Sequence, residues 1–428
     1  MTKTIQVYFF IIACLLLLST VGTDKYLEAE SGQACKRSVK LNNYNNWQFD
    51  GKYSWELDEN LQIIARQDNI CFTEHWERAN KVEGWKKITP QTLKALNPKA
   101  KVYRVYDLCC KNTWDTDWYS PDDKSRMQTP LTKAAIDANN WWLRDGIGSI
   151  IKENEKTWFL DVGKPGFKEA FLRNLLDRNA GKGFDGFVFD YWYPEISDVL
   201  HGRHRPEAYT TDEEWFADAW KPFITYLADG LHKAGYRIIG NCVGGYPNTN
   251  PKQIWQRSKV DGTIYEQWAV DWPNNGGKWL PGSLIEKRIN ALYKDPLEVW
   301  TADYGLKSSD PEYERKQTVA LAMYYVAIPE SQEKRSYHHI KDGSVYWENL
   351  WDFYIGSPAE PPVKLPDKYF WSRKYTDGIV LLNYESIENI AYSLKGEYRN
   401  PVGETISGDI ALPPHTAMIL AKKGPDSK

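Results

Sequence analysis

The sequence predicts an α/β fold, a (β/α)8 TIM barrel, followed by a small C-terminal antiparallel β-domain. From about residue 61 to residue 303, short apolar runs alternate with helical segments, as in repeated βα units. Several of these runs end on a carboxylate. Beyond Pro361 and Pro362 the pattern changes to short alternating segments separated by Gly, Asn and Pro, which is typical of an antiparallel sheet.

Seven apolar runs are the expected barrel strands: Leu61–Ala65, Lys101–Tyr106, Thr157–Leu160, Phe184–Phe189, Tyr236–Gly240, Gly262–Tyr265 and Leu297–Thr301. An eighth strand is expected between Ser336 and Trp347. The expected helices are Pro90–Leu96, Lys168–Arg178, Asp212–Ala234, Ser283–Tyr293 and Pro311–Val326. Seven recognisable βα units, and an eighth whose strand is not located within its range, favour a closed barrel over an open sheet. The terminal β-segments are Lys368–Arg373, Gly378–Asn383, Ile390–Leu394 and Thr416–Leu420.

The chain divides into a signal peptide at 1–23, an N-terminal extension at 24–60, the barrel at 61–360 and the β-domain at 365–424. The run Val7–Leu18 follows Lys3 and is shorter than an ordinary membrane span, so it indicates a secretory signal. An uncleaved anchor is the alternative. We expect a secreted protein, in the periplasm, at the cell surface or outside the cell, with no stable membrane insertion after signal removal.

The composition favours a sugar ligand over nucleic acid. The 428 residues carry a formal net charge of -3, which gives no electrostatic basis for binding nucleic acid. There are 20 Trp and 27 Tyr against 14 Phe, and Trp and Tyr combine an apolar face with a polar group. Such rings suit an oligo- or polysaccharide, although large cores use them too.

The segment from Gly183 to Trp192 carries the strongest functional signal. The run Phe184–Phe189 is almost wholly apolar, as expected of a strand buried on both faces, and it stops at Asp190. At the C-terminal ends of barrel strands, side chains line the active-site mouth. A carboxylate there, followed by Tyr191 and Trp192, suits glycosidic-bond chemistry. The alternative is that Asp190 only caps a turn or helix.

Carboxylates end four more of the proposed strands, and in a barrel all five acids would converge on one cavity. The acids are Asp107, Asp161, Asp190, Glu266 and Asp303. Glycoside hydrolysis needs two such groups, one to protonate the leaving oxygen and one to act as nucleophile or to activate water. We expect Asp190 and Glu266, on strands 4 and 6, to be this pair. The others would bind substrate hydroxyls, unless Asp161 and Asp303 merely cap loops.

Aromatic residues flank both members of the pair, and we expect Tyr191, Trp192, Tyr265 and Trp268 to contact substrate, about half of these rings being core instead. No cofactor is expected. A divalent metal held by the same acids is the competing chemistry, but no compact ligand spacing supports it. Cys242 could be a nucleophile, although a buried small residue is the simpler interpretation.

The chain resembles hypothetical glycosyl hydrolase family 15, a family of (β/α)8-barrel glycoside hydrolases. The matching elements are Asp161-Val162-Gly163, Gly183-Phe184-Asp185-Gly186 leading to Phe189-Asp190, Tyr265-Glu266, Tyr354-Ile355-Gly356-Ser357-Pro358, Tyr375–Asn383 and Leu412–Ala417. In related retaining families with dextranase-like enzymes, the acid ending strand 4 is the nucleophile and the acid ending strand 6 donates the proton. The resemblance therefore implies these roles for Asp190 and Glu266.

The sequence thus predicts a secreted glycoside hydrolase that cleaves an O-glycosidic bond with an Asp/Glu pair, retention being favoured. Two alternatives stay open, a non-catalytic glycan-binding barrel and a metal-dependent hydrolase. The sugar, the linkage, endo or exo action, the stereochemical outcome, the disulfide connectivity and the oligomeric state are not specified by these patterns.

Overall fold

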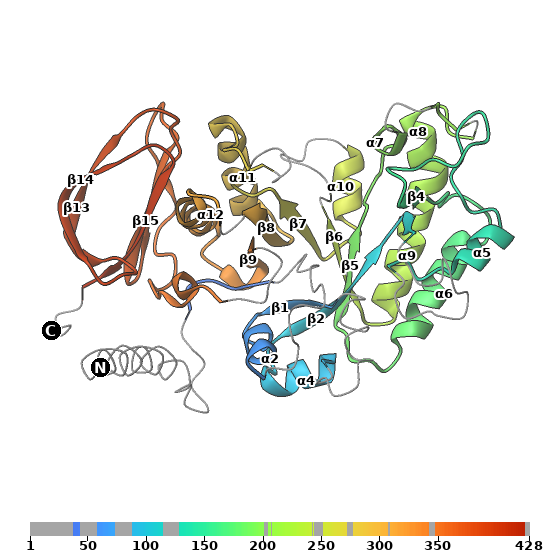
Figure 1. Ribbon diagram of the computed structural model, residues 1–428, viewed down its shortest axis with the longest axis horizontal. Coiled ribbons are helices and arrows are strands. Elements are labelled where there is room, and N and C mark those ends of the chain that lie inside the picture. Colours follow the sequence, from blue (N-terminus) through green and yellow to red (C-terminus); the bar gives the residue numbers. More distant parts are fainter. Residues whose placement is uncertain are drawn as a thin grey trace, which may run out of the picture. The chain divides into compact units, whose positions relative to one another are not determined.

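The computed structural model describes residues 37–42, 58–72, 88–113, 128–200, 204–206, 208–241, 243, 251–271, 277–306, 309–341 and 347–423 (Figure 1). The chain separates into two compact units, Met1–Arg37 and Ser38–Lys428, and all elements below belong to the second. The predicted signal peptide lies outside the described residues. Within the described part, no helix is both long and apolar enough to cross a membrane.

The described part of the second unit contains a seven-stranded parallel sheet in the order β1-β2-β5-β6-β7-β8-β9. Its strands are β1 Asn69–Phe72, β2 Lys101–Asp107, β5 Gly186–Asp190, β6 Arg237–Asn241, β7 Gly262–Glu266, β8 Glu298–Leu306 and β9 Arg335–Lys341. A short segment completes the ring: Leu41 forms a parallel bridge with Tyr337 of β9, and Asn42 forms one with Asn69 of β1. The predicted (β/α)8 barrel is confirmed, with the bridging residues Leu41 and Asn42 in the place of its first strand.

Two of the expected strands were wrong. Leu61–Ala65 belongs to helix α2, Asp58–Ala65, where Leu61, Ile64 and Ala65 recur at helical spacing and share one apolar cluster. Thr157–Leu160 gives β4, Thr157–Phe159, which pairs only with β3, Cys110–Asn112, in a separate two-stranded sheet. The segment 40–42 and β1 take their places, so the barrel begins before residue 61. Asp190 and Glu266 still end the fourth and sixth strands.

Helices cover the outside of the barrel, and most follow the predicted ranges. They are α4 Pro90–Leu96, α6 Phe167–Asn179, α9 Lys221–Lys233, α10 Pro251–Arg257, α11 Gly282–Lys294 and α12 Tyr313–Ala327. Helix α4 begins where expected because Thr89 and Thr92 form a capping box and Pro90 occupies the first turn. Helix α9 continues from α8, Asp212–Glu214, through a π-helical segment, Trp215–Trp220. Shorter helices in the connections are α5 Lys133–Ala138 and α7 Ile196–Leu200.

The barrel interior is filled by side chains from alternate positions of its strands. These form one apolar cluster: Cys71, Tyr103, Val105, Val188, Ile239, Ile264, Trp300 and Ala302. Because side chains alternate between the two faces of a strand, this cluster fixes which residues point inward along each strand. A carboxylate that lies two residues from a cluster member on the same strand therefore points into the barrel. A carboxylate that lies one residue from a cluster member points outward.

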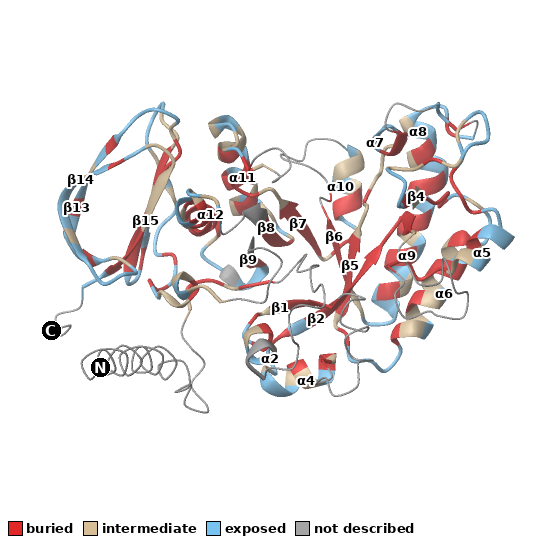
Figure 2. Ribbon diagram, viewed as in Figure 1, coloured by how far each residue is buried: buried red, intermediate tan, exposed pale blue. Residues whose placement is uncertain are grey.

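The predicted C-terminal β-domain is confirmed as an antiparallel sheet in the order β10-β11-β12-β15-β13-β14. Its strands are β10 Val363–Lys364, β11 Phe370–Tyr375, β12 Gly378–Asn383, β13 Ile390–Arg399, β14 Thr405–Leu412 and β15 Thr416–Lys422. This sheet packs on α12, which is buried along almost its whole length (Figure 2). Arg373 donates hydrogen bonds to the carbonyls of Tyr325 and Val326, 3.2 and 3.0 Å away, and so caps the C-terminal end of α12.

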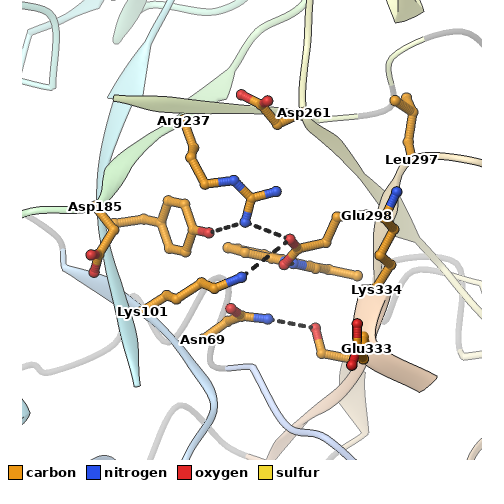
Figure 3. Close-up of polar contacts among 12 residues, drawn as sticks. Asn69, Lys101, Asp185, Arg237, Asp261, Leu297, Glu298, Glu333 and Lys334 are labelled. Carbon is orange, nitrogen blue, oxygen red and sulfur yellow. Dashed lines mark hydrogen bonds and ion pairs between the residues drawn. The ribbon is translucent and has the colours of Figure 1, made fainter. Parts of the chain in front are cut away.

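The N-terminal end of the barrel interior holds a polar cluster built around Glu298, at the start of β8 (Figure 3). Arg237 Nη1 lies 2.7 Å from Glu298 Oε2 and donates to Tyr103 Oη at 3.0 Å. Trp300 Nε1 donates to Glu298 Oε1 at 2.7 Å, and Lys101 Nζ lies 3.9 Å from Oε2. Because this end of a barrel serves stability, we assign the cluster a structural role.

Candidate active site

Four polar side chains point inward at the C-terminal ends of consecutive barrel strands. Each follows an interior apolar residue by two positions, so each continues the inward-facing row of its strand. The four residues are Asp107 on β2, Asp190 on β5, Asn241 on β6 and Glu266 on β7. The structure therefore brings the predicted pair, Asp190 and Glu266, together with Asp107 at the mouth of the barrel.

Asn241 connects the two predicted catalytic carboxylates. Its Nδ2 donates to Asp190 Oδ1 at 3.0 Å and to Glu266 Oε1 at 2.8 Å. These two oxygens are therefore no more than 5.8 Å apart, the sum of the two distances. The amide of Asn241 must present its NH2 group here, because its carbonyl oxygen would face two acceptors. The uncharged side chain of Asn241, on β6, thus binds one acid on each of the two neighbouring strands, β5 and β7.

The chain turns sharply directly after each of these acids. Tyr191, after Asp190, has φ of 55°, and Gln267, after Glu266, has φ of 54°. Neither residue is glycine, and a non-glycine residue in the left-handed region costs free energy that its surroundings must offset. The amide of Tyr191 donates to Asp190 Oδ1 at 2.7 Å, so this turn also fixes the carboxylate. Such strain is concentrated at functional sites.

Asp107 stands beside Asp190, because the two residues are paired in the register of β2 and β5. It is buried, and its Oδ2 accepts a hydrogen bond of 2.6 Å from Asn112 Nδ2. Asn112 is held in turn by Thr157, whose hydroxyl donates to Asn112 Oδ1 at 2.7 Å. The β3–β4 sheet, inserted between β2 and β5, therefore fixes one wall of the site.

Asp161 does not end a barrel strand, contrary to the prediction, because β4 lies in the inserted sheet. Its Oδ1 accepts hydrogen bonds from the Tyr209 hydroxyl at 2.8 Å and from the Gly163 amide at 3.1 Å. Burial raises the pKa of Asp161, although these hydrogen bonds and nearby Lys164 lower it in part. The contacts are those of a loop-capping residue, the alternative interpretation for this position.

Asp303 lies within β8, three residues before the end of the strand, and does not face the barrel interior. It directly follows Ala302, an interior residue, so it points to the outer side of β8. There its Oδ1 accepts the amides of Ala269 at 2.8 Å and Val270 at 3.4 Å, in the segment after Glu266. Burial raises the pKa of Asp303 to about 6, against the lowering effect of backbone amides and Arg288. The expectation that Asp303 binds substrate in the mouth was wrong.

Three of the four aromatic residues predicted to bind substrate are core residues. Trp192 is buried and donates to Gln256 at 2.6 Å, and Tyr265 is buried with its hydroxyl 2.7 Å from Asp295. Trp268 is fully buried and donates to the carbonyl of Ala320 at 3.2 Å. Tyr265 follows interior Ile264 by one position, so it must face outward. Tyr191 remains the candidate at the mouth.

Glu153 is a site residue that the sequence patterns did not indicate. It lies in the connection between β2 and β5, and its Oε2 accepts a hydrogen bond of 3.1 Å from the hydroxyl of half-buried Tyr191. Burial is the main cause that raises the pKa of Tyr191, and the charges of Asp107, Glu153 and Asp190 raise it further. These acids therefore all lie near one tyrosine. No periodicity or spacing marks Glu153 in the sequence.

The thiol of Cys109 contacts the backbone at Tyr191, where the chain turns after Asp190. Its thiol lies 3.0 Å from the carbonyl oxygen of Tyr191, and burial raises the pKa of Cys109, which keeps the thiol protonated. Cys242, the alternative nucleophile, lies outside the described residues. Among the residues that the structure does describe, no group of three or more His, Cys, Asp or Glu side chains is arranged to hold a metal ion.

Solved structures similar to this chain include three glycosidases. The GH27 β-L-arabinopyranosidase of Geobacillus stearothermophilus aligns at 11% identity over 92% of this chain and 98% of that chain, with a TM-score of 0.46. A GH31 α-xylosidase from a soil metagenome aligns at 10% over 87% and 62%, with a TM-score of 0.47. The maltogenic α-amylase AmyB of Thermotoga neapolitana aligns at 10% over 85% and 92%, with a TM-score of 0.43. Likenesses this weak carry no argument about function.

No curated protein matches the sequence. Residues 94–379, which span the chain from α4 to β12, match the model of a family described as hypothetical glycosyl hydrolase family 15. This range includes both carboxylates joined by Asn241 and most of the barrel that presents them. The chain therefore belongs to hypothetical glycosyl hydrolase family 15, and its activity class is that of a glycoside hydrolase.

Proposed function

We propose that the protein is a secreted retaining glycoside hydrolase that cleaves an O-glycosidic bond of an oligo- or polysaccharide, with Asp190 as nucleophile and Glu266 as general acid/base. The observation that carries this proposal is the hydrogen bonding of Asn241 to both carboxylates. It supports a pair of acids fixed at the short separation that double displacement needs.

The distance between the acids favours retention. Retaining enzymes hold their two carboxyl groups about 5–5.5 Å apart, whereas inverting enzymes leave about 6.5–9.5 Å for a water molecule. The upper limit of 5.8 Å between Asp190 Oδ1 and Glu266 Oε1 lies below the range of inverting enzymes, which supports retention.

The reaction has two steps. An oxygen of Asp190 attacks the anomeric carbon while the Glu266 carboxyl gives its proton to the departing glycosidic oxygen, so the C–O bond breaks and a glycosyl ester forms. Glu266, now a carboxylate, takes a proton from water, and the resulting hydroxide displaces Asp190 from the anomeric carbon. Two carboxylates this close repel each other when both are ionised, which favours one shared proton before the first step.

The neighbouring groups have supporting roles in this proposal. The Asn241 amide and the Tyr191 backbone amide both donate to Asp190 Oδ1, so they fix the plane of the attacking carboxylate. Asp107 and Glu153 lie on the side of the site formed by the inserted β3–β4 sheet, where carboxylates can accept hydrogen bonds from sugar hydroxyls. Tyr191 would offer a ring edge or face to a sugar.

A panel of polysaccharides and aryl glycosides tests the proposal, with products resolved by mass and the first-formed anomer determined by NMR. Release of sugar with the substrate's anomeric configuration, unchanged in chelator, is the expected result. First formation of the opposite anomer would show inversion and remove the nucleophile role from Asp190. Binding without release would favour a glycan-binding protein, and loss of activity in chelator would favour a metal-dependent hydrolase.

A further inference from the structure

The segment directly after Glu266 is held by hydrogen bonds from several distant parts of the chain. Asp303 accepts from the amides of Ala269 and Val270, at 2.8 and 3.4 Å. Arg288 Nη1, on α11, donates to the carbonyl of Trp268 at 3.0 Å. All of these groups are buried, so each contact is formed away from water. The segment therefore has little freedom to shift.

One of these contacts comes from the C-terminal β-domain. Tyr384, which directly follows β12, donates its hydroxyl hydrogen to the carbonyl of Ala269 at 2.6 Å. The same hydroxyl accepts the amide of Leu280 at 3.2 Å, and the Tyr384 side chain is buried. Ala269 is thus bound on both its polar backbone groups, the N–H by Asp303 of the barrel and the C=O by Tyr384 of the β-domain.

This arrangement affects Glu266 because only Gln267 lies between Glu266 and the hydrogen-bonded residues Trp268, Ala269 and Val270. Gln267 holds a left-handed conformation, φ 54°, which persists only when the following residues are fixed. If the segment relaxed, the Cα of Glu266 and its carboxyl group would move with it. A displacement of about 1 Å of a reacting group can cost on the order of a hundredfold in rate.

We propose that Tyr384 is a positioning residue for Glu266, acting with Asp303 through Ala269, so that the β-domain forms part of the catalytic unit. The proposal rests on the function proposed above for its kinetic consequences, since it assigns Tyr384 to the acid/base step. It assigns Tyr384 no contact with substrate. The predicted structural consequence, a segment after Glu266 that loosens without the Tyr384 hydroxyl, does not depend on any activity.

The chain offers a matched control in Tyr375. This residue also lies in the β-domain, is equally buried at 1% exposure, and donates its hydroxyl hydrogen to a backbone carbonyl, that of Tyr325, at 2.7 Å. Tyr325 belongs to α12 and not to the segment after Glu266. Tyr384→Phe and Tyr375→Phe therefore remove similar hydrogen bonds between the β-domain and the barrel. Only Tyr384→Phe removes a hydrogen bond to the segment after Glu266.

Hydrogen exchange of the folded, full-length variants tests the structural part. Tyr384→Phe should speed exchange of the amides of residues 267–270 by about tenfold, while Tyr375→Phe leaves them at the wild-type rate. Asp303→Leu, of similar size but with no oxygen to accept the amides of Ala269 and Val270, should speed exchange at both as well. Unchanged exchange in both Tyr384→Phe and Asp303→Leu would overturn the proposal.

The kinetic part of the proposal is tested by measuring how the rate of hydrolysis depends on the leaving group. Aryl glycosides with acidic phenols depart with little help from a general acid, whereas alkyl glycosides need the proton. Tyr384→Phe should therefore lower kcat/KM about tenfold on the poor leaving groups, with less than about a twofold change on the good ones, because kcat/KM reports the first step, in which the leaving group takes the proton. Tyr375→Phe should show no such difference.

The two measurements separate the two proposals. Equal slowing of good and poor leaving groups by Tyr384→Phe would contradict the positioning role while leaving the glycosidase function intact. If the wild type cleaved no glycoside, the proposed function would fail, and the exchange rates would still decide whether Tyr384 holds the segment after Glu266.

Discussion

The side-chain nitrogen of Asn241 lies 2.8 Å from Oε1 of Glu266, joining the ends of the adjacent parallel strands β6 and β7. The same nitrogen also holds Asp190, on the other side of β6. A neutral donor shared by two acids lowers their mutual repulsion without supplying a positive charge. The geometry of the pair therefore depends on a residue that carries no charge.

Replacement of Asn241 tests this dependence. Asn241→Asp places a third carboxylate against the pair, so we expect kcat/KM to fall by at least about a hundredfold and the pH optimum to rise, because the cluster retains protons more strongly. Asn241→Leu, of similar size and without charge, should lose activity with little shift of the optimum. Measured pH profiles check both outcomes, and near-wild-type rates in either variant would contradict the bridging role.

Asp303 should make the stability of the fold depend on pH. Burial raises its folded pKa to about 6, above the ordinary value of 3.8, so between these values the native state keeps a proton that the unfolded chain has lost. Stability therefore falls as pH rises through this interval. The described charged or titratable groups around Asp303 include Arg288, Tyr337 and Tyr384.

Urea unfolding at pH 4 and pH 7 measures this effect in the wild type and in Asp303→Asn. The stability of Asp303→Asn relative to the wild type should increase by about 2 kcal/mol from pH 4 to pH 7, since each pKa unit corresponds to about 1.4 kcal/mol and the unfolded carboxyl is already partly ionised at pH 4. A relative stability that is the same at both pH values would show that Asp303 does not titrate in this range.

The polar cluster at the opposite end of the barrel should affect stability alone. The Glu298 side chain is only 5% exposed and binds Arg237, Trp300 and Lys101, so Glu298→Gln should lower the free energy of unfolding by about 2 kcal/mol and leave kcat unchanged (Figure 3). Glu360→Gln, which removes an exposed ion pair with Lys374, is the surface control. A fall in kcat for Glu298→Gln at unchanged stability would argue against a structural role.

The parts of the fold that the sequence predicted well are those with strong local signals. Helix α4 and strand β12 have the predicted bounds, α4 because of its cap and proline and β12 because its apolar run GIVLL stops at polar Asn383. The segment 40–42 and the four-residue β1 are too short to show a pattern, and they form strands only because β9 and β2 flank them. Strand pairing, not local propensity, determines them.

The residues of the candidate site also differ in how well a local sequence pattern predicts them. The inward direction of Asp190 and Glu266 follows from the apolar runs before them, and the same alternation applied to Tyr265 and Asp303 would have placed both outside the cavity. Trp192 lies beyond the left-handed Tyr191, where alternation no longer applies. Asn241 directly follows the expected strand Tyr236–Gly240, but only its hydrogen bonds to both acids show its role, and Glu153 is brought to the mouth by an insertion.

The most direct test of the central claim is hydrolysis by Asp190→Asn and Glu266→Gln, compared with the wild type and with Asp161→Asn. The last variant changes a carboxylate that the structure places in the loop after β4, where Asn can still accept from Tyr209 and Gly163. We predict a loss of kcat/KM of about 10⁴-fold in Asp190→Asn, a large loss on poor leaving groups in Glu266→Gln, and nearly full activity in Asp161→Asn. Wild-type rates in both Asp190→Asn and Glu266→Gln would contradict the assignment of this pair.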